Sequence, residues 1–177
     1  MVAERAEVFA WLADVPDPEI PAISICDLGI VRDAWWSDDA DATLHVAITP
    51  TYAGCPAMRA IASDVVAALH ARGIANVAIE TRLSPPWTTD WLTAAGREKL
   101  HAFGISPPRA RDAAGVRDAA HADLDLVTLL AEPEERAACP RCASTTVVLV
   151  SRFASTPCKA LYRCGVCREP FDHFKTH

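Results

Sequence analysis

The chain has 177 residues, of which 51% are hydrophobic and 23% charged, a composition typical of a globular protein. No apolar run approaches the roughly 20 residues that a membrane-spanning helix needs, and the N-terminus lacks the charged-then-apolar pattern of an export signal. We therefore expect a cytoplasmic protein with no membrane partner. Its seven cysteines are then expected to serve metal or thiol chemistry rather than a disulfide framework.

Charge is distributed unevenly along the chain. Residues 1–138 carry 11 Lys and Arg against 21 Asp and Glu, a net −10, whereas residues 139–177 carry 6 against 2, a net +4. The acidic part disfavours nucleic acid as the main partner. The basic end leaves nucleic-acid binding open as an alternative, although docking to an acidic protein surface explains it equally well.

The predicted elements begin with an amphipathic helix over residues 3–14. Next comes Asp17-Pro18-Glu19-Ile20-Pro21, in which the prolines bias the backbone towards extended geometry and hold the two carboxylates in a fixed relation. The alternative interpretation is an ordinary turn in which the aspartate caps backbone N–H groups. Residues 30–36 and 43–49 then predict a hairpin across an acidic turn.

The stretch Thr49-Pro50-Thr51-Tyr52-Ala53-Gly54-Cys55-Pro56 joins that hairpin to a helix predicted over residues 56–72. Because Pro56 suits the first position of a helix, Cys55 is expected at or beside the N-cap, where free N–H groups and the helix dipole favour a thiolate. Gly54 lets the loop backbone approach a ligand closely. The alternative is a buried free cysteine packed at the start of the helix.

A third strand is predicted over residues 75–83, parallel to the second because a helix connects them. Thr89 or Asp90 is expected to cap the last helix of this part. Together these elements predict an α/β (α+β) fold, a small mixed-sheet sandwich, for residues 1–105. Residues 106–137 predict a partly helical linker.

Two C-x-x-C pairs dominate residues 138–177. Cys139 and Cys142 form one pair, and 21 residues separate them from Cys164 and Cys167, slightly more than is usual in four-cysteine zinc sites. The segments between them predict a ribbon hairpin, and so small a unit needs a metal to fold. Four unrelated thiols are the alternative. A thioredoxin-type redox pair is disfavoured because neither pair opens a helix in a βαβ unit.

Three further side chains of the predicted zinc ribbon could reach the metal. Cys158 is a possible additional thiol, and His173 and His177 could also compete as ligands. The sequence favours a packed or exposed role without metal ligation for each of them.

The motifs resemble those of known proteins. Asp17-Pro18-Glu19, Asp27-Leu28-Gly29 and residues 51–56 resemble the small iron–sulfur assembly domain of SufT-like proteins. Residues 158–164 and 170–175 closely resemble the tail of the phenylacetate-degradation protein D (PaaD) family. That family joins the assembly domain to a C-terminal zinc ribbon, which is the order seen here.

This resemblance implies a function in aerobic phenylacetate catabolism. PaaD proteins accompany the multicomponent oxygenase that epoxidises phenylacetyl-CoA, and they look like maturation factors. By the match of motif positions, Cys55 would be the ligand of iron or of an iron–sulfur cluster, with Asp17 and Glu19 nearby. The implied cofactors are structural zinc and a transient iron or cluster. The implied partners are the oxygenase and reductase components.

The residue chemistry agrees in part with this implication. A thiolate is a soft ligand suited to a cluster, but Cys55 alone cannot supply the four ligands that a 2Fe–2S cluster needs. A homodimer would offer two copies, and Cys26, a client or a small thiol could supply the rest. Trp35, Trp36 and Trp87 offer apolar surface for such a dimer.

The chain lacks the sequence features of the oxygenase itself. A di-iron bundle needs two Glu-x-x-His motifs, whereas this chain has a single such stretch, Glu98 to His101. We also find no P-loop and no dinucleotide fingerprint, and so expect an accessory protein that is not catalytic by itself. A non-catalytic structural or docking subunit of the oxygenase complex, with Cys55 merely buried, stays open. A zinc-ribbon nucleic-acid binder is weaker, because zinc and four thiolates reduce the +4 of the ribbon to about +2.

Overall fold

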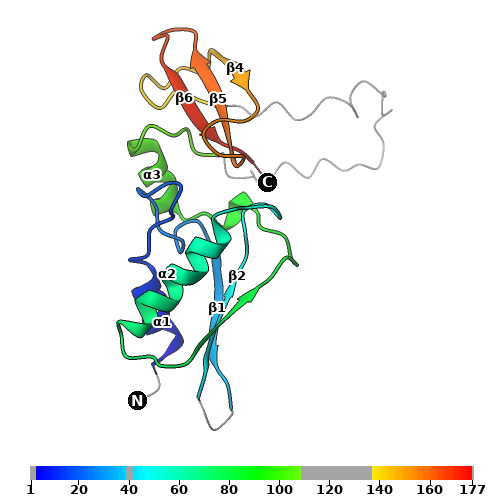
Figure 1. Cartoon of the computed structure of the whole chain (residues 1–177). Coiled ribbons are helices and arrows are strands. Elements are labelled where there is room, and N and C mark those ends of the chain that lie inside the picture. The colour runs from blue at the N-terminus through cyan, green and yellow to red at the C-terminus, as the bar shows by residue number, and fades with distance from the viewer. Residues whose placement is uncertain (1–2, 39–41, 109–136, 177) are drawn as a thin grey trace, which may run out of the picture.

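Two small three-stranded sheets lie end to end in the computed structural model of this protein, which describes residues 3–38, 42–108 and 137–176 (Figure 1). Each sheet has its own buried cluster of side chains. The mixed α+β fold expected from the sequence is thus confirmed. The predicted partly helical linker, residues 106–137, falls almost wholly outside the described residues, as does His177. Among the described helices, none has the length and apolar character needed to cross a bilayer.

The first sheet consists of β1 (Val31–Trp36), β2 (Leu44–Ile48) and β3 (Val77–Thr81), in the order β1-β2-β3. β1 and β2 are antiparallel, whereas β2 and β3 are parallel and joined by α2 (Met58–His70). The predicted hairpin and the predicted parallel pairing are both confirmed. The parallel pair brings the loop after β2, which carries Cys55, to the end of the sheet where α2 begins.

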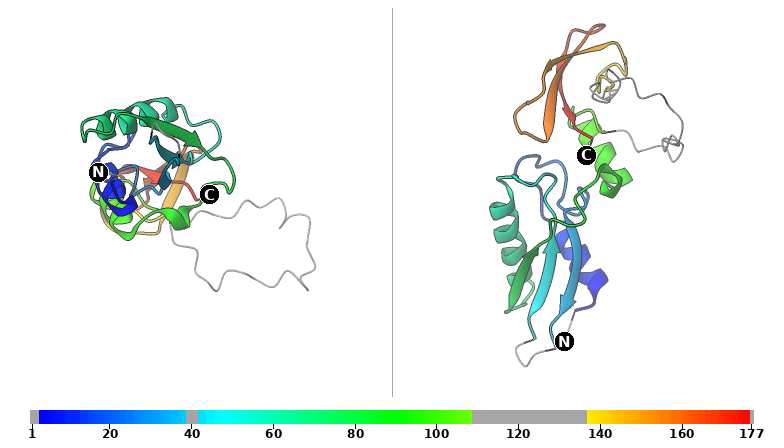
Figure 2. Two further views of the ribbon diagram at one scale, coloured as in Figure 1. Left: turned by 90° about the horizontal axis from the view of Figure 1, so that it is seen from below. Right: turned by 90° about the vertical axis from the view of Figure 1, so that its right-hand side faces the viewer.

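Two helices cover one face of this sheet (Figures 1 and 2). α1 (Arg5–Leu12) packs beside β1 and α2, and α2 packs beside β3. The opposite face carries Trp35, whose ring stacks on His45 with 5.2 Å between the centroids. No described helix covers that second face, so only one side of the sheet faces the core.

The last helix of the first part begins later than the sequence predicted. Thr89 and Asp90 lie in a short 3-10 helix, η1 (Thr89–Trp91), and α3 (Ala94–Ala102) follows it. The cap is Thr93, whose Oγ1 accepts a hydrogen bond from the Gly96 N–H at 2.9 Å. The reason is a tertiary contact, because Thr93 also donates its N–H and its hydroxyl to Asp27 at 2.9 and 3.0 Å.

The second sheet is an antiparallel ribbon with the order β4-β5-β6. β4 (Val147–Ser151) and β5 (Lys159–Cys164) form the predicted hairpin, and β6 (Pro170–Phe174) was not predicted. We refer to residues 137–176 as the ribbon. Its small core contains Tyr162 and Phe171, whose rings stack with centroids 6.0 Å apart.

Contacts around Ser106 and Phe174 join the ribbon to the first sheet. The Ser106 N–H donates to the carbonyl of Asp172 at 2.8 Å, and the Phe174 N–H donates to the carbonyl of Ser106 at 2.9 Å. Phe174 and Cys158 of the ribbon belong to the buried cluster of the first part. Side chains of the ribbon therefore form part of the buried core of the first part.

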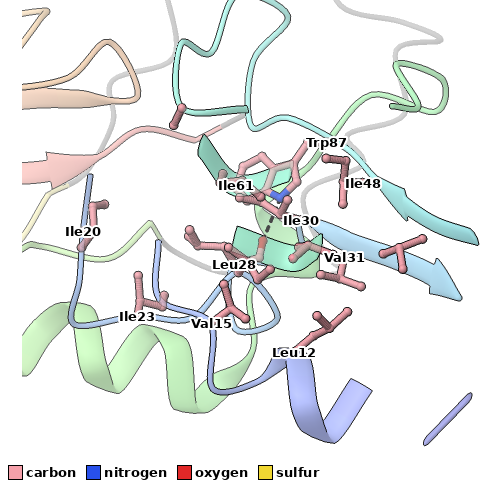
Figure 3. Packing of buried hydrophobic residues seen from close by; sticks show 14 of the residues in the cluster. Leu12, Val15, Ile20, Ile23, Leu28, Ile30, Val31, Ile48, Ile61 and Trp87 are labelled. Atoms are coloured by element: carbon pink, nitrogen blue, oxygen red, sulfur yellow. Dashed lines mark hydrogen bonds between the residues drawn. The ribbon is translucent and has the colours of Figure 1, made fainter. Parts of the chain in front are cut away.

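Trp87 occupies the centre of this junction. It is 4% exposed, its ring centroid lies 5.9 Å from that of Phe174, and its indole N–H donates to the carbonyl of Leu28 at 2.8 Å (Figure 3). The expectation that Trp87 offers apolar surface for a dimer was therefore wrong. Its large ring is used inside the molecule, because the ribbon covers it.

Candidate metal centres

The four cysteines of the two C-x-x-C pairs form one group, with their sulfur atoms within 4.8 Å of one another. Cys139 and Cys167 are 3.7 Å apart at Sγ, and Cys142 and Cys164 are 3.6 Å apart. A tetrahedral ion with metal–sulfur bonds of about 2.3 Å requires sulfurs about 3.8 Å apart. The group therefore has the size of a four-sulfur metal site.

Both C-x-x-C turns have the same backbone geometry. The residue after each second cysteine, Ala143 or Arg168, has a positive φ of 58° or 67°. In the second turn the N–H groups of Cys167 and Val166 point at Cys164 Sγ at 3.5 and 3.4 Å. These N–H groups lower the pKa of Cys164 to about 6, which favours the thiolate that a metal requires.

Cys158 and His173 lie outside this four-sulfur group. His173 is buried, and its Nδ1 is 3.1 Å from Ser106 Oγ at the junction. Cys158 is 4% exposed and belongs to the buried cluster of the first part, not to that of the ribbon. Cys158 therefore packs with the first part, whereas His173 lies between Ser106 and Tyr162 of the ribbon.

The acidic motif lies in the loop between α1 and β1. Asp17 is 6% exposed, and its Oδ1 accepts hydrogen bonds from the N–H groups of Glu19 and Ile20 at 2.9 and 2.8 Å. The aspartate thus caps a turn, which is the plainer of the two interpretations of its sequence. Burial nevertheless raises the pKa of Asp17 above its ordinary value in spite of these bonds.

Cys55 lies two residues before the N-cap of α2, which is Ala57, because the helix begins at Met58. The thiol is half-buried, and burial raises its pKa to about 11 although the N–H of Ala57 lowers it. Glu19, Cys158 and Asp17 raise the pKa of Cys55 further. The expectation that the helix start favours a thiolate at Cys55 was therefore wrong, because the groups of the protein itself favour the protonated thiol. A helix dipole contributes only about 0.3–1 kcal/mol, and burial outweighs it.

The charges of Glu19 and Asp17 act on Cys55, and they also act on Cys158 of the ribbon. The Cys158 thiol lies 3.0 Å from Thr156 Oγ1. Burial raises the pKa of Cys158, and Glu19 and Asp17 act in the same direction. We call Asp17, Glu19, Tyr52, Cys55 and Cys158 the junction cluster.

Tyr52 is the member of the junction cluster that the sequence did not single out. Its hydroxyl is buried and has no hydrogen-bond partner among the described residues. Burial raises the pKa of Tyr52, and the charges of Cys55, Glu19 and Cys158 raise it further. A buried polar atom without a partner costs about 1–3 kcal/mol, which a ligand at this position would recover.

Lys159 was considered from the sequence only as a basic residue of a nucleic-acid binder, and its place near the acidic motif was not predicted. It is 4% exposed, and its Nζ lies 3.2 Å from Asp172 Oδ2. It also lowers the pKa values of Asp17 and Glu19, so its charge acts on the acidic motif. The only sequence signal was its place directly after Cys158.

Cys26 lies elsewhere in the first part. Its thiol points at the carbonyl of Phe9 at 3.9 Å, and burial, followed by the charge of Asp27, raises its pKa to about 12. None of the groups that act on it belongs to the junction cluster. The structure therefore does not bring Cys26 to Cys55 within one chain.

Two family models match this chain. Residues 5–80 match the model described as iron–sulfur cluster assembly protein, and residues 125–175 match the PaaD zinc beta ribbon domain. A protein of Escherichia coli (strain K12), named as a subunit of "Putative 1,2-phenylacetyl-CoA epoxidase", is 44% identical over 169 residues. The match spans 96% of this chain and 91% of the relative.

Solved structures resemble the first part of the chain. A domain of unknown function from Bacillus anthracis has 26% identity and a TM-score of 0.48, over 54% of this chain and 90% of that one. A conserved hypothetical protein from Thermotoga maritima has 30% identity and a TM-score of 0.45, over 55% and 94%. A Mycobacterium tuberculosis protein described as associated with Fe–S complex assembly and repair has 34% identity and a TM-score of 0.35, over 56% and 84%.

The order of the two matched models and the identity to the E. coli relative lead to one conclusion. The chain belongs to the PaaD family, in which an iron–sulfur assembly domain precedes a zinc ribbon.

Proposed function

We propose that this protein is a maturation factor that helps to assemble a metal centre, iron–sulfur or di-iron, of the multicomponent phenylacetyl-CoA epoxidase. The observation that carries the proposal is the junction cluster, in which the charges of the two carboxylates act on both thiols near the assembly-domain motif. Thiolates suit iron and iron–sulfur clusters, and carboxylates suit iron ions. The protein would act in the cytoplasm, with the oxygenase and reductase components as its clients.

The setting of Cys55 suits a carrier that takes up metal and passes it on. Gly54 beside it is exposed, and a Cβ atom there would meet only the ring of Tyr52 at 3.6 Å. The protein's own packing therefore does not require a glycine, whereas a bound ion or a docked client would benefit from the open backbone. A high pKa means that Cys55 becomes a thiolate only when a metal replaces its proton.

We assign the metal of the ribbon as structural zinc, held by Cys139, Cys142, Cys164 and Cys167. Its four sulfurs leave no open position, as in structural zinc sites. Zinc would neutralise part of the thiolate charge and hold the two C-x-x-C turns together. It has no part in the proposed transfer of iron.

A docking function has support of its own. The edge strand β4 exposes Val148 (63%) and Val150 (57%), and Phe153, just after the strand, is 65% exposed. Such a patch suits a protein partner.

A nucleic-acid function has less support, because Arg141 already pairs with Glu169 at 2.9 Å and Lys159 with Asp172.

The test is Cys55→Ala, compared with Cys26→Ala, in cells that express the oxygenase and its reductase. We expect Cys55→Ala to fold and to keep its zinc, because the thiol is half-buried and lies outside the ribbon. We also expect an oxygenase with depleted iron and no epoxidation of phenylacetyl-CoA. Cys26→Ala should behave as the wild type, because Cys26 lies outside the junction cluster.

Three measurements separate the two functions. They are the iron content of the purified oxygenase, the epoxidation rate, and co-purification of this protein with the oxygenase. A fully metallated and active oxygenase in the presence of Cys55→Ala would overturn the maturation function. If co-purification also persisted, the protein would be a docking subunit in which Cys55 is only packed.

A further inference from the structure

Cys158 is too far along its strand to serve the metal of the ribbon. It directly precedes β5, whose last residue, Cys164, is one of the four grouped cysteines. A strand rises about 3.3 Å per residue, so six residues place Cys158 about 20 Å from Cys164. The thiol thus lies at the opposite end of the ribbon from the four-sulfur group.

The docking of the ribbon fixes where Cys158 lies. Its carbonyl accepts a hydrogen bond from the Lys175 N–H at 3.0 Å, which ties it to the end of β6. Phe174, in the same segment, packs against Trp87 and pairs with the backbone of Ser106. Cys158 therefore keeps its position for as long as the ribbon stays docked.

Cys158 is buried in a cluster that includes residues next to the assembly motif in sequence. It shares a buried cluster with Ile20 and Ala57, which are close neighbours in sequence of Glu19 and Cys55. Beside it, a cavity of about 500 Å³ between the two parts is lined by Glu19 on one side and by Ser155, Lys159 and Asp172 on the other.

The two thiols share their electrostatic neighbours. The charges of Glu19 and Asp17 act on both Cys55 and Cys158, and Cys158 acts on Cys55 directly. The hydroxyl of Tyr52 is buried and has no hydrogen-bond partner among the described residues. The charges of Cys55, Cys158 and Glu19 all raise its pKa. A phenol in that position can donate a hydrogen bond to a metal-bound thiolate or to a sulfide.

We propose that Cys158 is the second thiolate ligand of the Cys55 site, so that the iron or the cluster is held between the assembly domain and the ribbon. This inference rests on the proposed function and extends it, because it makes the ribbon part of the site that carries the cargo. It also reduces the number of cluster ligands that must come from elsewhere from three to two, a shortage that otherwise calls for a second copy of the chain. The carboxylates of Asp17 and Glu19 offer oxygen ligands in the same place.

The test uses the zinc-loaded full-length chain, titrated with Co²⁺ in the absence of air. Co²⁺ binds sites of this type less tightly than Zn²⁺ does, so it should leave the zinc in the ribbon, and the zinc content is measured to check this. Thiolate ligands give Co²⁺ a charge-transfer absorption whose intensity grows with the number of thiolates. The titration therefore reports both the affinity and the count of sulfur ligands.

We expect the wild type to bind one Co²⁺ with the intensity of two thiolates. Cys158→Ala should lose half of that intensity and bind at least about tenfold more weakly, the loss that even an outer partner of a metal site can cause. Cys26→Ala is the matched control, because it removes a partly buried thiol that packs against the same buried cluster, and it should bind as the wild type does. Cys158→Ser keeps the side-chain volume and the contact with Thr156. It therefore distinguishes a loss of Co²⁺ binding that is due to the missing thiolate from one that is due to undocking of the ribbon.

The outcomes separate this proposal from the proposed function. Wild-type affinity and intensity in both Cys158 variants, with a loss in Cys55→Ala, would overturn the role of Cys158 and leave that of Cys55 intact. A wild type that shows no thiolate-bound Co²⁺ would overturn both ligand assignments. The iron content of the oxygenase would then still decide whether the protein is a maturation factor.

Discussion

Gly29 has a backbone φ of +68°, and a Cβ atom on it would stand 2.5 Å from the carbonyl oxygen of Trp91. It follows Asp27, whose carboxylate accepts bonds from the Thr93 hydroxyl at 3.0 Å and from Lys99 Nζ at 2.5 Å. These two motif residues therefore hold the start of α3 against the loop before β1. They serve the fold, and they lie outside the junction cluster.

Gly29→Ala should lower the free energy of unfolding by at least about 2 kcal/mol, because the new methyl group meets both backbone strain and overlap. Thermal unfolding measures this loss. Gly54→Ala is the control: its Cβ meets only an ordinary contact at 3.6 Å, so its stability should stay within about 0.5 kcal/mol of the wild type. Equal melting temperatures for the two variants would contradict this account of Gly29.

His173 makes stability depend on pH at the junction. It is 2% exposed, its ring lies edge-on to Tyr162 at 5.6 Å, and burial lowers its pKa to about 4. The unfolded chain binds the proton more readily, with a pKa near 6.5, so stability is complete above that pH. It should fall as the pH drops from about 6.5 to about 4, by at most about 3 kcal/mol from this group.

Chemical denaturation at several pH values checks the prediction. The matched variant is His173→Gln, which keeps a polar group near Ser106 but does not titrate. Acid also protonates the cysteine ligands in both proteins, so only the difference between them reports His173. Parallel stability curves between pH 4 and 6.5 would show that His173 does not contribute.

At the scale of elements, the ribbon and the first sheet share structural side chains. The sequence suggests two units that fold separately. Phe174 and Cys158 nevertheless belong to the core of the first part, and Trp87 packs against Phe174. Loss of the ribbon would therefore expose apolar surface on its neighbour.

Cys164→Ser, or removal of the metal with a chelator, should unfold β4, β5 and β6, because the ribbon core is small and the metal supplies folding energy. The first part should stay folded but lose stability, and the emission of Trp87 should shift to the red as Phe174 leaves it. Fluorescence and zinc analysis follow the two effects. Trp87→Phe removes the shifted signal and serves as the control. Full zinc retention in Cys164→Ser would contradict the ligand assignment.

The sequence predicted what depends on local patterns. Sequence patterns predicted β1 and β2, the connecting helix predicted β3 as the parallel partner of β2, and the spacing of cysteines predicted the four-sulfur group. Thr93 was missed as a cap because Asp27, 66 residues earlier, selects it. β6 was missed because the stretch Pro170–Phe174 is short and begins with proline.

The chemistry of the junction cluster depends on contacts between distant segments. The position of Cys55 near a helix start follows from its own loop, but its raised pKa follows from burial and from Glu19, Asp17 and Cys158. Only the docking of the ribbon brings Cys158 there. The motif therefore predicts which residue is the ligand, whereas the tertiary structure determines its pKa and the groups near it.

For the whole molecule, we predict a homodimer or a higher oligomer through the first sheet. Trp36 packs partly into the core and Trp87 is buried, so of the three expected tryptophans only Trp35 lies on the uncovered face. Arg82 lies over its ring at 5.0 Å, and His45 stacks beneath it. An aromatic residue in such a place suits a contact between copies.

Sedimentation at micromolar concentration, with metal present, measures the oligomeric state. Trp35→Glu should shift the protein towards monomer without loss of zinc, because Trp35 lies far along the chain from the ribbon. Arg59→Glu, an exposed charge on α2, is the control and should leave the assembly unchanged. A wild type that sediments only as a monomer would reject this mode of assembly.

The junction also brings together two points of the chain that are far apart in sequence. The Ala138 N–H donates to Ser106 Oγ at 3.4 Å, although 28 residues, 109–136, run between the described segments on either side. The length of this connection matters little for the placement of the ribbon, since closing a loop fourfold shorter would cost only about 1 kcal/mol less. Two separate polypeptides, cut within residues 109–136, would together keep every described contact of the junction, so we expect the docked ribbon to form again when the two are mixed.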